Sequence, residues 1–176
     1  MTNEELFAIL RSHILALTGV PECILYAQNA DAPQGEYASV NPRYAIGERG
    51  QANIYNKDVI GDLVETDVRP QAMITVAVEF FRGEANQRAE RLLQMGKIQT
   101  VTWDLFKYKM SVRNTSGVLD LTAIQSSNYE QRARIEIYLW AELSTKYTTN
   151  NILGTSIVAE NEDGDTIQEI DIDIRG

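Results

Sequence analysis

From Ala133 to Leu143, aliphatic side chains alternate with charged or aromatic ones in the stretch Tyr129-Glu-Gln-Arg-Ala-Arg-Ile-Glu-Ile-Tyr-Leu-Trp-Ala-Glu-Leu-Ser-Thr-Lys-Tyr147. Successive side chains of a strand point to opposite faces, so this pattern predicts a half-buried β-strand. An unbroken strand from Tyr129 to Tyr147 would extend roughly 60 Å, whereas a domain of this length is about 40 Å across. We therefore expect the strand to bulge, bend or project as one arm of a hairpin. The predicted inner residues are Ala133, Ile135, Ile137, Leu139, Ala141 and Leu143.

The alternate residues of this strand, which would face outward, combine charges of both signs with large aromatic rings. One interpretation is an ordinary solvated face, and another is a face covered by a helix. The third is a subunit interface, because Tyr, Trp and Arg are enriched at interface hot spots. The candidate interface residues on the strand are Arg132, Arg134, Glu136, Tyr138, Trp140 and Glu142.

The remaining pattern predicts an α+β fold: a mainly antiparallel sheet with a long β-hairpin, and helices packed on one face. A capping box at Thr2-Asn-Glu-Glu5 begins the first helix, which Gly19 and Pro21 end. Asp163-Gly164 indicates a hairpin turn near the C-terminus. Two more helices are expected at 84–95 and 98–110, and strands at 22–27, 36–46, 60–68, 73–81, 117–124, 152–160 and 166–174.

The segment Gly47–Lys57 is polar and contains two glycines, so we expect a long, mobile loop there. Long loops inside domains are uncommon and tend to be functional. Its sizeable apolar groups, Ile54 and Tyr55, are therefore added to the candidate interface residues.

Composition argues against several classes of protein. A formal net charge of −9 does not suit a general nucleic-acid binder, which needs a basic face. With the lone His13 and the lone Cys23, we expect no catalytic triad, no Cys/His metal site and no intramolecular disulfide. Neither a signal peptide nor a membrane span is apparent, so assembly in the cytoplasm is expected. We expect no cofactor.

Several segments together resemble the neck or tail-terminator proteins of tailed bacteriophages. They are the opening helix ending in Ala-Leu-Thr-Gly19, the strand Ile74–Phe80, the run Arg88-Ala-Glu-Arg-Leu-Leu93, and Tyr129-Glu-Gln-Arg-Ala-Arg-Ile-Glu-Ile followed by a Thr/Asn-rich turn. The resemblance extends from about Glu4 to Val158. It suggests a neck/tail-terminator-like α+β domain at 1–158 and an acidic C-terminal hairpin arm at 159–176.

The resemblance implies a structural virion protein, not an enzyme. Such proteins assemble as a homo-oligomeric ring, expected here to be a hexamer, at the head–tail neck. The ring terminates the tail tube and meets the head connector or adaptor, and DNA passes through it without specific binding. Alternatives are another virion ring or tube subunit, such as a head-completion or tail-tube protein, or a small cytoplasmic enzyme or ligand-binding domain.

The acidic excess is concentrated in the last residues of the chain. Between Glu160 and Asp173 there are seven carboxylates and neither lysine nor arginine. Alternation predicts that Ile170, Ile172 and Ile174 form the buried side of this arm. The opposite side is either a solvated face or the lining of a channel, and the candidate lining residues are Glu169, Asp171 and Asp173.

Overall fold

The computed structural model describes residues 2–27, 29, 31–59, 63–125, 128–150 and 154–173. The chain divides into two units. Unit 1 comprises Met1–Gln51 and Pro70–Leu143, and unit 2 comprises Ala52–Arg69 and Ser144–Gly176. Three helices and mostly antiparallel sheets confirm the predicted α+β class. The predicted strand positions Ile60, Ile152 and Ile174 lie outside the described residues.

Unit 1 is built on one sheet with the order β1-β2-β5-β10-β6, to which β7 adds by pairing with β10. The pair β1–β2 is parallel, and β2, β6 and β7 are antiparallel to their central neighbours. A separate hairpin pairs β8 with β9. The strands of unit 1 are β1 (Glu22–Leu25), β2 (Tyr37–Glu48), β5 (Gln71–Phe81), β6 (Met110–Thr115), β7 (Leu119–Asp120), β8 (Ala123–Gln125), β9 (Asn128–Glu130) and β10 (Arg132–Glu142).

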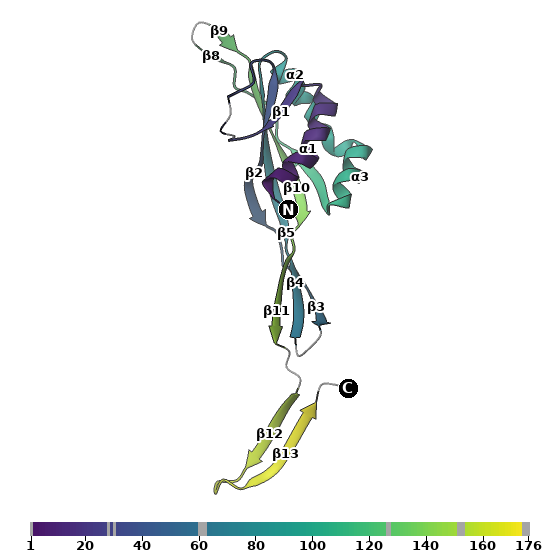
Figure 1. Ribbon diagram of the computed structural model, residues 1–176, viewed down its shortest axis with the longest axis vertical. Helices are drawn as coiled ribbons and strands as arrows, with labels where there is room; N and C mark the ends of the chain where they lie inside the picture. The colour runs from purple at the N-terminus through teal and green to yellow at the C-terminus, as the bar shows by residue number, and fades with distance from the viewer. Residues whose placement is uncertain are drawn as a thin grey trace. The chain divides into compact units, whose positions relative to one another are not determined.

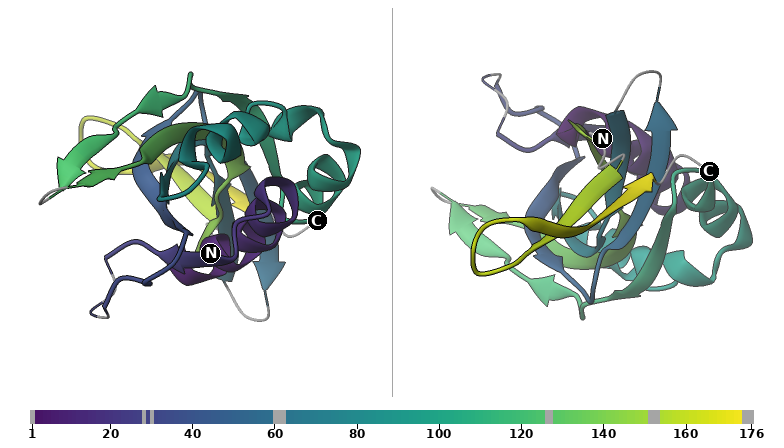
Figure 2. Two further views of the ribbon diagram at one scale, coloured as in Figure 1. Left: turned by 90° about the horizontal axis from the view of Figure 1, so that it is seen from above. Right: turned by 90° about the horizontal axis from the view of Figure 1, so that it is seen from below.

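All three α-helices lie on one face of this sheet, as predicted (Figure 1 and Figure 2). Helix α1 (Asn3–Thr18) begins with the predicted capping box: the Glu5 N–H donates to the Thr2 hydroxyl, and the Thr2 N–H donates to the Glu5 carboxylate. The helix ends at Gly19, whose φ of 67° is the left-handed conformation that glycine adopts readily.

Helices α2 (Ala85–Leu92) and α3 (Gln99–Lys107) flank the short 3₁₀ turn η1 (Met95–Lys97). On these helices Ala85, Ala89, Leu92, Val101 and Leu105 are buried, whereas Leu93 is 38% exposed and Phe106 is 70% exposed. Both lie at or beside the end of a helix, where the apolar stripe no longer faces the sheet.

The core lies between the helices and the inner parity of β5 and β10. Every inner residue of β10 from Ala133 to Ala141 is buried, which confirms the alternation, while Leu143 is only half-buried. The β10 residues Ile135, Ile137 and Leu139 lie opposite Val78, Val76 and Ile74 of β5.

The predicted long strand is broken into three. β9, β10 and β11 (Thr145–Asn150) are separated at Gln131 and again at Leu143–Ser144. The second break follows from Pro70, which stands between β4 (Leu63–Arg69) and β5 and has no N–H to donate. The Leu143 N–H still donates to the Pro70 carbonyl at 3.0 Å, but no regular ladder crosses this position.

The predicted long loop at Gly47–Lys57 is wrong. β2 continues to Glu48, and β3 (Asn53–Val59) begins after only four residues, so Ile54 and Tyr55 belong to a strand. The register of β2 against β5 shifts between Asn41 and Ala45, around Pro42, which has no N–H to donate to the ladder. β6 was not predicted at all.

Unit 2 contains a three-stranded antiparallel sheet in the order β11-β4-β3 and the hairpin of β12 (Gly154–Glu160) with β13 (Thr166–Asp173). The predicted turn is confirmed, with Gly164 at a φ of 83°. The prediction that Ile170 is buried is wrong, because it is 44% exposed. The side chain of Ile172 lies outside the description.

In the three-stranded sheet, Asp67 joins β4 to the beginning of β11. Its carboxylate accepts hydrogen bonds from the Arg69 side chain at 2.7 Å and from the Ser144 hydroxyl at 2.6 Å. These two bonds, with Arg69 the larger influence, lower the pKa of Asp67 below its ordinary value. The bonds therefore hold the charged carboxylate in the folded sheet.

Replacing Ile137 by alanine should lower the free energy of unfolding of unit 1 by about 2–5 kcal/mol, because it leaves a cavity under the helices. Urea denaturation followed by far-UV circular dichroism measures the change. Ile124→Ala is the matched control: this side chain is 62% exposed, so its loss should cost little. Equal losses for both variants would contradict the core described above.

Asp67→Asn should destabilise the three-stranded sheet at neutral pH. A folded-state pKa below the unfolded value means that the contribution of Asp67 is present above pH 3.8 and is lost as the pH falls through the folded pKa. The difference between wild type and Asp67→Asn should therefore shrink below pH 3.8, measured by amide hydrogen exchange in β11. The control is Asp58→Asn on the opposite face, and a pH-independent difference at Asp67 would contradict the assignment.

Candidate functional site

The six predicted interface residues of β10 lie together on the sheet face opposite the helices. All six are half-buried, and within the described residues no helix covers this face. The pairing register sets Phe81, Glu79 and Met73 of β5 beside Arg132, Arg134 and Trp140. We call this surface the open sheet face; it comprises Arg132, Arg134, Glu136, Tyr138, Trp140, Glu142, Met73, Glu79 and Phe81.

Charges on the open sheet face are paired along the surface. Arg132 pairs with Glu79, and Arg134 lies 3.7 Å from Glu79 and 2.8 Å from Glu136. The Tyr138 hydroxyl donates to the Glu136 carboxylate at 3.1 Å. Burial first, and then this carboxylate, raise the pKa of Tyr138, so the phenol stays protonated at neutral pH. A neighbouring molecule could cover this face without leaving these charges unpaired.

Aromatic rings fix the arginine side chains of the same face. The guanidinium of Arg134 lies 4.3 Å from the ring centre of Tyr44, and that of Arg132 lies 4.8 Å from Phe81. Tyr37 stacks on Phe81 with 4.6 Å between ring centres. Such cation–π contacts hold long side chains in place before any partner arrives, which lowers the entropic cost of association.

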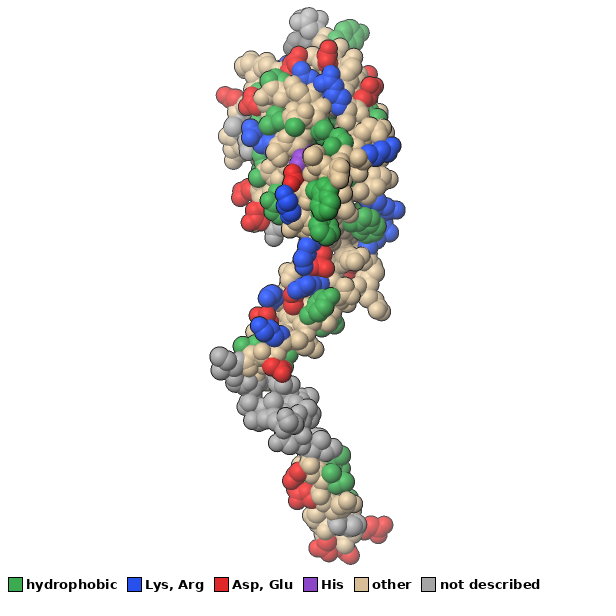
Figure 3. Space-filling model, turned by 90° about the vertical axis from the view of Figure 1, so that its right-hand side faces the viewer, with side chains coloured by type: hydrophobic (Ala, Val, Ile, Leu, Met, Phe, Trp, Pro, Cys, Tyr) green, Lys and Arg blue, Asp and Glu red, His purple; other side chains and the backbone are tan. Residues whose placement is uncertain are grey.

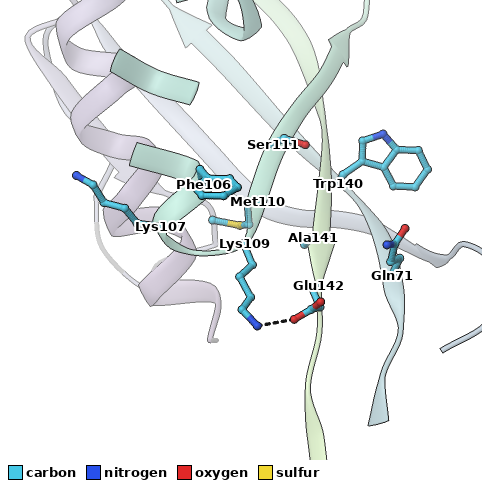
Figure 4. Close-up of a pocket in the computed structure, with 9 residues that line it drawn as sticks. All are labelled: Gln71, Phe106, Lys107, Lys109, Met110, Ser111, Trp140, Ala141 and Glu142. Carbon is cyan, nitrogen blue, oxygen red and sulfur yellow. Dashed lines mark hydrogen bonds and ion pairs between the residues drawn. The ribbon is translucent and has the colours of Figure 1, made fainter. Parts of the chain in front are cut away.

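One end of β10 borders an apolar groove of about 720 Å³. In Figure 4, Trp140 and Phe106 extend away from each other, on either side of the β6–β10 pair. At the end of the groove, Lys109 Nζ and a Glu142 carboxylate oxygen are 2.6 Å apart. Sequence reasoning missed this groove because it did not predict β6, although Met110 and Val112 give a short alternating signal.

The three-stranded sheet of unit 2 has one charged and one largely uncharged face, and it separates the other two predicted interface residues. Tyr55 lies on the charged face, with its ring centre 4.7 Å from the Arg69 guanidinium, and a Lys146–Glu65 ion pair of 3.0 Å lies on the same face. Ile54 lies on the uncharged sheet face. The register gives that face Ile54, Asn56, Val64, Thr66, Val68, Thr145, Tyr147 and Thr149, with Asp58 as its one charge.

The β12–β13 hairpin is also two-sided. Among the side chains that the structure describes, the register puts the candidate channel residues Glu169 and Asp171 on one face, together with Ser156 and Val158, and we call this the acidic hairpin face. The side chain of the third candidate, Asp173, lies outside the description. The other face has no charge among its described side chains, which are Ile157, Ala159, Gln168 and Ile170, and we call it the uncharged hairpin face.

Among the described residues, no group of three or more His, Cys, Asp or Glu is placed to hold a metal ion. His13 lies at the edge of the core, with Nε2 3.8 Å from an Asp104 carboxylate oxygen. Cys23 is buried, and burial raises the pKa of its thiol to about 11, which leaves it unreactive at neutral pH.

The helix-bearing side of unit 1 mixes acidic, basic and apolar side chains, and forms no continuous basic surface for phosphates (Figure 3). Among the described helices, none is both long and apolar enough to cross a membrane. The open sheet face has an unusual composition, since charges of both signs alternate there with large aromatic rings.

Comparison with known proteins identifies the family. No curated protein sequence matches the chain. The model of one protein family, described as "Phage neck terminator protein", matches residues 4–175, which is nearly the whole length. Because this match covers far more than half of the chain, the chain belongs to the phage neck terminator protein family.

Proposed function

We propose that this protein forms a homo-oligomeric ring at the head–tail neck, terminates the tail tube and joins it to the head connector. The family match across residues 4–175 carries this proposal. Membership in the family gives the coarser statement: a structural protein of the phage neck, located in the virion, that contacts other neck and tail proteins. The ring, its termination of the tube and its joining role are the proposed additions.

A six-fold ring needs two different surfaces on each subunit, because its contacts are head-to-tail and do not pair a surface with itself. The open sheet face is the surface we assign to one side of this contact. Two features support that choice: its charges are paired internally, and its arginines are held over aromatic rings. Both lower the cost of covering this face compared with a face of unpaired, mobile charges.

We also propose that the acidic hairpin face lines the path of the DNA. Seven carboxylates between Glu160 and Asp173 without a lysine or arginine would repel phosphates, so DNA would pass without binding. The register supports this role because it puts Glu169 and Asp171 on one face of the hairpin.

The double variant Tyr138→Ala/Trp140→Ala should leave the monomer folded and weaken ring formation. Truncating a hot-spot aromatic residue costs about 2 kcal/mol or more, which corresponds to roughly a 30-fold loss of affinity per residue. Circular dichroism reports folding, and electron microscopy of the purified protein counts rings. Trp103→Ala is the matched control, since Trp103 is 61% exposed on helix α3. Simultaneous loss of fold and rings would mean that the pair stabilises the monomer and would remove it from the interface.

Replacing Glu169, Asp171 and Asp173 by lysine should permit ring assembly and slow DNA ejection. Added salt should relieve the defect, because surface charges are screened within about 8 Å at physiological ionic strength. A control with the same change in charge replaces Glu22, Glu84 and Glu90 in unit 1 and should eject DNA normally. Normal ejection by the hairpin variant would remove these residues from the channel, and failed assembly would assign them to a subunit contact.

A further inference from the structure

Apolar side chains are exposed on the uncharged hairpin face, and burying them would stabilise the hairpin. Among the described residues, β12 and β13 pair only with each other, and an isolated two-stranded hairpin is marginally stable in water. Ile157 is 54% exposed and Ile170 is 44% exposed on this face. Further strands or a packed apolar surface would supply the missing stabilisation.

The uncharged sheet face is in the same situation. Ile54 is 63% exposed and Tyr147 is 48% exposed. The described elements of unit 2 include no helix that could cover them. Thr66 and Asn56 satisfy each other on this face, where the Thr66 hydroxyl donates to the Asn56 side-chain oxygen at 3.0 Å. With its polar groups partly satisfied and a single carboxylate, the face can be buried at low cost.

We propose that the uncharged hairpin face of one copy of this chain packs onto the uncharged sheet face of a second copy. This contact adds a specific subunit interface to the proposed ring. It rests on the proposed function only because both need several copies of the chain to associate. It would make a small two-layered packing of three strands against two, with the sheets about 10 Å apart.

The charges determine which side of the hairpin docks. Turning the hairpin over would press Glu169 and Asp171 against a sheet face whose one charged residue is Asp58. Burying carboxylates beside a like charge and without a cation is strongly unfavourable. Docking through Ile157 and Ile170 leaves the acidic hairpin face in contact with water.

The area of the hairpin is too small for this contact to hold two copies together by itself. β12 has seven residues and β13 has eight, as against seven in each of β3 and β4. At about 3.3 Å per residue and 4.8 Å per strand, the hairpin covers roughly 230 Å². Two such surfaces bury far less than the 1,200 Å² typical of a stable pair, so one contact alone is weak. A closed ring forms every contact at once. The two faces also differ from each other and belong to the same chain, which is what a head-to-tail contact requires.

Cysteine cross-linking tests the contact in the full-length chain. Ile54→Cys and Ile170→Cys are made on separate chains, mixed, and oxidised at concentrations that span ring assembly. Cys23 is buried and remains protonated, so the introduced thiols are the reactive ones. The expected result is a shift from monomer to mixed disulfide dimer on a non-reducing gel. The matched control mixes Glu65→Cys with Glu169→Cys, which lie on the opposite faces and should stay monomeric.

Each outcome decides the proposal. No mixed dimer, or equal dimer from the control pair, would overturn it. So would an internal disulfide in a diluted Ile54→Cys/Ile170→Cys double variant, because the hairpin would then cover its own chain. Protection of the Ile170→Cys thiol by a tail protein in place of a second copy would also refute the contact. Electron microscopy distinguishes failure of this contact from failure of the proposed ring. Mixed dimers without rings would support the contact and contradict the ring. Rings without mixed dimers would support the ring and contradict the contact.

Discussion

The antiparallel pairing of β5 with β10 is the interaction on which the rest of unit 1 depends. Eleven-residue strands run side by side in one register from Arg132 opposite Phe81 to Glu142 opposite Gln71. The inward-facing residues of the two strands form the apolar surface on which the three helices pack. The outward-facing residues form the open sheet face. A slip of one residue would exchange the two, exposing the core and burying a row of charges. The core and the open sheet face are therefore specified by the same register.

Pro70 limits how far this pairing extends. Without an N–H it cannot continue the ladder, and the chain opposite it breaks at Leu143–Ser144. On the far side of the break a new sheet begins, with Thr145 opposite Val68 and Asp67 bound to Ser144 and Arg69. A single imino acid thus separates a strand that reads as continuous in the sequence into parts of two units.

The sequence predicted features that depend on local patterns. Alternation identified both faces of β10, the capping box located the start of α1, and Asp163-Gly164 located the hairpin turn. Sequence patterns failed where residues far apart in the chain determine the structure. Gly47–Lys57 reads as a polar loop, yet β3 forms because β4 offers it a partner. The ion pair of Arg132 with Glu79 joins residues 53 positions apart, and no local pattern signals it. The assignment of these surfaces to subunit contacts remains a prediction.

The connectivity of unit 2 has a consequence for the order of folding. β3 and β4 are neighbours in the sequence, so their hairpin can form early and locally. β11 lies far away: the Ser144–Asp67 bond spans 77 residues and the Lys146–Glu65 bond spans 81. Closing so long a loop is entropically costly, and β5 with β10 meets that cost by bringing Pro70 beside Leu143. We therefore expect β11 to join the sheet of unit 2 only after β5 and β10 have paired.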